Sequence, residues 1–90
     1  MIYTLQIDMQ VSGCYTDRIL HGNVDLFEFQ AATLSGAIRD SCAIGDLLRG
    51  EGFHIWYGHV CIGTTSLYAM RHEAEILAQR LVSLQAQFGG

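Results

Sequence analysis

The strongest pattern in this sequence is an apolar repeat that runs from residue 65 or 66 to residue 88. Apolar side chains recur there at alternating steps of three and four: Leu67, Met70, Ala74, Leu77, Leu81, Leu84 and Phe88. This spacing predicts one long amphipathic α-helix with a heptad-like seam, which Gly89-Gly90 would cap. Ile76 and Val82 lie off the seam on opposite sides, so we expect the helix to contact more than one surface.

The N-terminal segment has a period of two, as in a β-strand. Residues 2–11 alternate between an apolar and a polar face, with Tyr3, Leu5, Ile7, Met9 and Val11 against Thr4, Gln6, Asp8 and Gln10. Such alternation predicts a half-buried strand. After a turn at Ser12-Gly13, residues 14–21 are expected to return as a second, weaker strand that ends before Gly22-Asn23.

Residues 24–30 fit two patterns. Phe27, Phe29 and Ala31 alternate as in a strand, but Phe27, Ala31, Leu34 and Ile38 also have helical spacing. We favour the strand. Thr33 then caps a helix that ends at Gly50-Glu51-Gly52, and its apolar stripe is Leu34, Ala37, Ile38, Ser41, Gly45 and Leu48.

Residues 53–62 are rich in β-branched and aromatic side chains, and the central Gly58-His59 can form a two-residue turn. Either a hairpin or one long strand is expected. The order β-β-(β)-α-β(-β)-α over residues 1–90 predicts a single α+β domain, a small antiparallel sheet with two helices on one face. The other face is then the expected place for the remaining apolar surface.

The composition points to an assembly of two copies. Apolar residues with glycine make up about 57% of the 90 positions, against a usual 45–50%, and charged residues only 16%. A chain this short buries a small core. We therefore expect a homodimer, which hides apolar surface against a second copy, together with binding to another protein.

The charge pattern excludes several functions. The chain has five arginines, nine carboxylates and a net charge of −4, which disfavours nucleic acid as a partner. Lysine is absent, which excludes Schiff-base, PLP and Walker-lysine chemistry. An RNA-binding sheet would require the arginines to gather on one face. No stretch is long and apolar enough for a membrane span or a signal peptide, so a cytoplasmic protein with free thiols at Cys14, Cys42 and Cys61 is expected.

The candidate binding residues form an aromatic and histidine group on one segment: Phe53, His54, Trp56, Tyr57 and His59. Such side chains provide large contact areas at low entropic cost, although they pack cores more often. Trp56 and Tyr57 point to opposite faces of a strand, so at least one is expected to point away from the helices.

No catalytic residue, metal or cofactor is assigned. His72-Glu73 begins a zincin-like motif, but Ile76 replaces its second histidine. His54, His59 and Cys61 lack the short ligand spacing of a zinc site, even with His21, Cys14 or Cys42 added. Cys14, Asp17 and His21 have the residue types of a nucleophilic site on a turn-rich stretch. The scattered carboxylates Asp8, Asp17, Asp25 and Asp40 mostly fit turns or solvent faces.

These observations favour a small acidic homodimeric interaction module that binds, and regulates or inhibits, another macromolecule through a sheet face or aromatic edge. The alternative is a small-molecule-binding protein or small enzyme with a pocket at the dimer interface, using His54, Trp56, His59 and Cys61. A flat apolar patch would favour the first hypothesis. A pocket of a few hundred Å³ with converging polar groups would favour the second.

Overall fold

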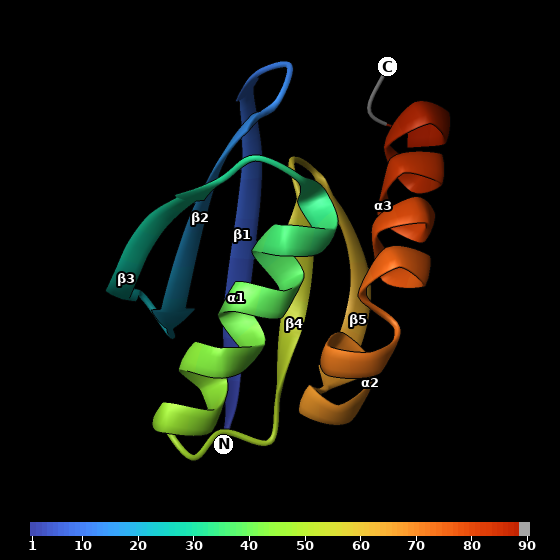
Figure 1. The fold of residues 1–90 in the computed structure, drawn as a ribbon. Helices are drawn as coiled ribbons and strands as arrows, with labels where there is room; N and C mark the ends of the chain where they lie inside the picture. Colours follow the sequence, from blue (N-terminus) through green and yellow to red (C-terminus); the bar gives the residue numbers. More distant parts are fainter. Residues whose placement is uncertain (89–90) are drawn as a thin grey trace.

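The computed structural model describes residues 1–88, which form five strands and three helices (Figure 1). In chain order these are β1 (Ile2–Val11), β2 (Cys14–His21), β3 (Val24–Ala31), α1 (Leu34–Leu47), β4 (Gly52–Tyr57), β5 (Val60–Ser66), α2 (Leu67–His72) and α3 (Ala74–Phe88). The predicted α+β class is confirmed. The helices lie on one face of the sheet, as expected.

The sheet has the strand order β3-β2-β1-β4-β5 and is mixed, so the prediction of an antiparallel sheet is wrong at one pair. β1 and β4 run parallel, with Leu5 opposite Ile55, and the other neighbouring strands are antiparallel. The cause is the path of α1, which carries the chain from the edge strand β3 back across the sheet (Figure 1). β4 therefore enters the sheet in the same direction as β3 and β1.

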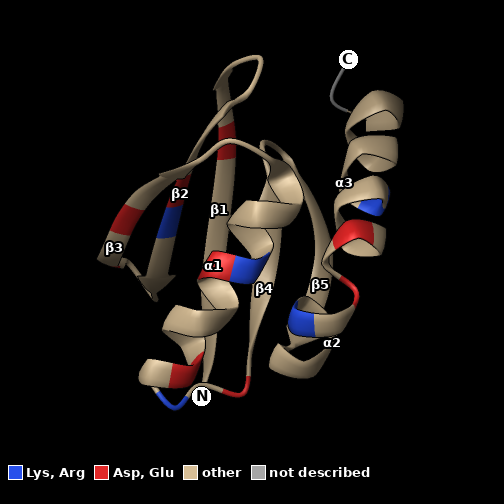
Figure 2. Ribbon diagram, in the orientation of Figure 1, with Lys and Arg blue, Asp and Glu red and all other residues tan. Residues whose placement is uncertain are grey.

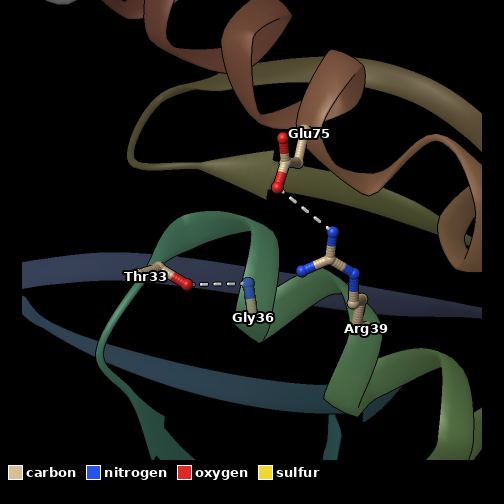
Figure 3. A network of polar contacts seen from close by, with 4 residues as sticks. All are labelled: Thr33, Gly36, Arg39 and Glu75. Carbon is tan, nitrogen blue, oxygen red and sulfur yellow. Dashed lines mark hydrogen bonds and ion pairs between the residues drawn. The ribbon is translucent and has the colours of Figure 1, made fainter.

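Two local predictions are confirmed, and the structure decides between two alternatives for residues 53–62. Residues 24–31 form a strand, as favoured over a helix. Thr33 caps α1, and its hydroxyl oxygen accepts a hydrogen bond of 3.0 Å from the amide of Gly36 (Figure 3). β4 and β5 form a hairpin in which Tyr57 pairs with Val60, and Gly58 enters the two-residue turn with a φ of 59°. That positive φ explains why glycine suits this position.

The predicted single C-terminal helix is wrong, because the chain bends at Glu73 and forms α2 and α3 instead. The Glu73 amide donates to the Ala69 carbonyl at 2.7 Å, while the Glu73 carbonyl accepts from the Leu77 amide at 2.9 Å. Glu73 thus ends one helix and begins the next. The bend lets α2 pack on α1 and lets α3 pack on both α1 and the β4–β5 hairpin. No glycine or proline marks it in the sequence.

The core lies between the sheet and the helices. Its fully enclosed side chains come from three strands and the three helices, and include Leu5, Ile7, Ile19, Ile38, Phe53, Ile55, Met70 and Leu81. An ion pair from Arg39 on α1 to Glu75 on α3, at 3.4 Å, joins two helices at the surface (Figure 3). A second pair joins Arg71 to Asp46.

The uncovered face of the sheet is mostly polar, which corrects the expectation that the surplus apolar surface would lie there. Strand register places on it the less polar side chains of Ile2, Leu20, Trp56 and Cys61 and a larger number of polar ones: Thr4, Gln6, Asp8, Thr16, Arg18, Glu28, Gln30, His54 and Thr64. The exposed large apolar side chains include Val24, Leu26 and Phe27 on β3 and Ile76, Val82 and Phe88 on α3. Half of the exposed large apolar side chains thus lie on β3 and α3, and the others, such as Met9, Val11, Leu47 and Tyr68, are spread over other elements.

Candidate functional site

The structure divides the predicted binding group into core and surface residues. Phe53 and Tyr57 point toward the helices and are 0% and 8% exposed, so they are core residues and not binding residues in this chain. His54 and Trp56 point to the uncovered face, and His59 lies exposed in the turn after β4. The prediction that Trp56 and Tyr57 point to opposite faces is confirmed, with Trp56 directed away from the helices.

Trp56 lies on the uncovered face near the end of β4, the strand next to the edge strand β5. It lies opposite Gln6 on β1 and Cys61 on β5. The Gln6 amide nitrogen donates to the Gly58 carbonyl at 3.1 Å and to an Asp8 carboxylate oxygen at 3.3 Å. Trp56 remains 37% exposed. A partly exposed tryptophan held among ordered polar groups is typical of a recognition surface.

A pocket of about 410 Å³ lies at the other side of the molecule, between β5 and helices α2 and α3. Its lining combines hydroxyls, one residue of each charge and apolar side chains: Ile62, Thr64, Thr65, Ser66, Ala69, Glu73, Ile76, Leu77 and Arg80. None of the five predicted binding residues lines it. Sequence reasoning missed the pocket because it depends on the bend at Glu73, which has no local signal.

The free edge of the sheet at β3 is a third surface. Six of its eight residues are exposed, among them Val24, Leu26 and Phe27, the last at 43%. The strand contains neither proline nor lysine, the residues that commonly protect sheet edges. The opposite edge, β5, is interrupted by a bulge, where Gly63 has a φ of 85° and its amide donates to the Cys61 sulfur at 3.2 Å.

Asp17 is buried on the helix-facing side of β2, which corrects its assignment to a turn or solvent face. It is 0% exposed, and neither carboxylate oxygen has a hydrogen-bond partner among residues 1–88. Desolvation by burial, with a smaller effect of the Asp40 charge, raises the pKa of Asp17 to about 7. The Ser41 hydroxyl on α1 is also buried and unpartnered in the described chain.

The residues considered above for nucleophilic catalysis and for metal binding do not come together in the fold. Cys14 and Asp17 point to opposite faces of β2, and His21 lies four residues, about 13 Å, beyond Asp17. In residues 1–88, no three or more His, Cys, Asp or Glu side chains are placed to hold a metal ion. Cys14, Cys42 and Cys61 are free thiols.

The arginines do not gather on the sheet, as the RNA-binding hypothesis requires. Figure 2 shows them spread over the molecule. Arg18 alone lies on a strand, while Arg39, Arg71 and Arg80 lie on the three helices and Arg49 follows α1. This distribution provides no continuous basic face for a phosphate backbone.

No helix in the described part of the chain has both the length and the apolar character needed to cross a membrane. Comparison with known proteins found no matching family model, no matching curated protein and no matching solved structure.

Proposed function

We propose that this chain is a non-enzymatic interaction module that works as a homodimer and binds another protein, which it regulates or inhibits by occupying part of its surface. The observation that carries this proposal is the exposed edge of β3, where apolar side chains flank unpaired backbone groups. A strand of this kind is a ready template for pairing with another chain.

The self-association rests on the contrast between the two sheet edges. β5 is interrupted by its bulge at Gly63, a common protection against pairing. β3 has no such protection over its last five residues, since its bulge lies nearer its start, beside Leu26. A second copy on β3 would also cover Phe27, which is 43% exposed in one copy.

The surface proposed for the other protein is the uncovered sheet face around Trp56. His54 and Trp56 are exposed there side by side on β4, and the His54 ring nitrogen Nδ1 is hydrogen-bonded to Thr64 at 3.0 Å. A hydrogen-bonded histidine beside a partly exposed tryptophan offers a large contact area for a partner. The three free thiols support a reducing compartment, so we propose a cytoplasmic location.

The homodimer is tested by sedimentation at micromolar concentration. We expect about twice the 10.0 kDa monomer mass, and a monomer across the concentration range would contradict the proposal.

The partner surface is tested by affinity capture from the native host's lysate, read by mass spectrometry. Trp56→Ala is compared with Tyr68→Ala, which removes an aromatic side chain that is 70% exposed on α2, away from the sheet face. We expect a protein that the wild type and Tyr68→Ala capture and Trp56→Ala loses. Equal capture by both variants would contradict a role for the Trp56 face.

The second candidate function is small-molecule binding in the pocket beside β5. Its volume of about 410 Å³ lies within the usual range of ligand sites, about 300–1,000 Å³. Glu73 and Arg80 supply one charge of each sign. Native mass spectrometry of freshly purified protein is the test: a bound small molecule that Arg80→Glu loses and Arg49→Glu keeps would favour this function over the first.

A further inference from the structure

We infer that the homodimer forms by antiparallel pairing of β3 with β3 of a second copy, about a two-fold axis that passes beside Phe29. This inference rests on the proposed homodimer and specifies its interface and its register. It joins the two five-stranded sheets into one of ten strands.

The backbone geometry of β3 determines which residues can bond to a new strand. His21 and Val24 close the two-residue hairpin between β2 and β3, and such a closing pair is hydrogen-bonded. Bonded pairs alternate along an antiparallel ladder. The odd-numbered residues of β2 therefore bond to β3, and across the bulge their partners are Phe27, Phe29 and Ala31. The amides and carbonyls of Glu28 and Gln30 point to the free edge.

The register is chosen by three requirements. Directly opposite residues of an antiparallel pair must point to the same face, so the two-fold axis must pass beside a residue and not between two. An axis at Glu28 places two like charges directly opposite each other, which is destabilising. An axis at Phe27 brings the bulge beside Leu26 into the paired segment.

An axis at Phe29 meets all three requirements. On the helix-facing side, Phe29 lies against Phe29 of the second copy and Phe27 lies against its Ala31. On the uncovered side, Glu28 lies opposite Gln30, a pairing that opposes no like charges and lets the two residues exchange backbone hydrogen bonds. Symmetry repeats this pair, so four backbone hydrogen bonds would form at the edge.

This arrangement also orients the proposed partner surfaces. A two-fold axis perpendicular to the sheet keeps both uncovered faces on one side of the ten-stranded sheet and both helix layers on the other. The two Trp56 side chains would be separated by seven strand spacings, about 34 Å. The dimer would thus present two equivalent recognition surfaces, turned relative to each other by the twist between neighbouring strands.

The register is tested by disulfide cross-linking in a Cys14→Ser, Cys61→Ser background, which leaves Cys42 in the core. Phe29→Cys should cross-link to itself under mild oxidation, because opposite residues in a pair without mutual hydrogen bonds lie about 4.5 Å apart at Cα, within disulfide reach. Val82→Cys, an exposed position on α3, should not cross-link.

A mixing experiment checks the register independently of Phe29. Phe27→Cys and Ala31→Cys should each give little cross-linked product alone and substantial product when mixed, because each position faces the other across the axis. Self-linking of either variant at the level of Phe29→Cys would overturn the register.

The edge itself is tested at Gln30 by two substitutions at one position. Gln30→Pro removes an amide proton that bonds only across the interface, and proline is tolerated at strand edges where the amide faces solvent. We expect Gln30→Pro to sediment as a monomer with an unchanged circular-dichroism spectrum, and Gln30→Ala to remain a dimer. A folded, dimeric Gln30→Pro would overturn the inference.

The possible failures are distinguishable. If the wild type is a monomer at every concentration, the proposed homodimer itself fails. If the wild type is a dimer but Phe29→Cys does not cross-link, the interface or register inferred here is wrong and the homodimer stands. Should Gln30→Pro lose its fold, the cross-linking result alone decides the inference.

Discussion

Replacing the buried carboxyl of Asp17 with an amide, in Asp17→Asn, should stabilise the protein at pH 8 and change its stability little at pH 4. Asp17 is fully enclosed, and its oxygens have no hydrogen-bond partner in the described residues. Burial first, and the Asp40 charge second, raise its pKa from 3.8 to about 7. The folded protein therefore favours the neutral acid, which asparagine resembles in shape and charge.

The magnitude follows from proton linkage. Because the folded pKa is raised, the stability contribution of Asp17 is fully present below pH 3.8 and is lost as the pH rises through 7. A rise of about three pKa units corresponds to about 4 kcal/mol at pH 8, since each unit is worth about 1.36 kcal/mol. Local relaxation and water entry reduce this cost, so we expect Asp17→Asn to gain about 2–4 kcal/mol at pH 8.

Urea denaturation of both proteins between pH 4 and pH 8 measures the effect. The free energy of unfolding of the wild type should decline relative to that of Asp17→Asn as the pH rises. Asp25→Asn is the matched control, because Asp25 lies exposed on β3, where its 4.0 Å ion pair with Arg18 contributes little to stability. Parallel profiles for the wild type and Asp17→Asn would show that Asp17 is ionised at little cost, and the burial argument would be refuted.

Three further predictions concern packing and metal content. Leu81→Ala removes a fully enclosed side chain from α3 and should cost about 2–5 kcal/mol in urea denaturation, whereas the exposed Gln79→Ala should cost about 0.5 kcal/mol or less; equal effects would contradict the packing of α3. Gly45→Ala places a Cβ 2.8 Å from the Phe53 ring and should cost about 1–3 kcal/mol by the same measurement, and a neutral result would show that the ring can move. Elemental analysis of untagged protein should find substoichiometric zinc, and one tightly held zinc per chain would overturn the assignment of no metal.

The candidate site could be predicted from the sequence only in part. Alternation along β4 was enough to place Trp56 and Tyr57 on opposite faces, because side chains of a strand alternate whatever its neighbours are. Only the complete fold determines which face of the sheet the helices cover. Phe53 and Tyr57 point to that covered face and are therefore core residues. The pocket beside β5 depends on where α3 turns after Glu73, which no residue of that segment encodes locally.

The local features of the fold could be predicted from the amino-acid sequence, because they depend on residues near one another in the chain. The alternation of residues 2–11 and the cap at Thr33 specify a strand and a helix start through short-range sterics and hydrogen bonds. Gly58 permits a two-residue turn, but the sequence left open whether a hairpin or one long strand would form there. Tertiary structure alone decided the parallel pairing of β1 with β4, the bend at Glu73 and the burial of Asp17. Each of these depends on packing between segments distant in the chain, where burial against α1 and the sheet outweighs the local preference for a continuous helix or a solvated carboxylate.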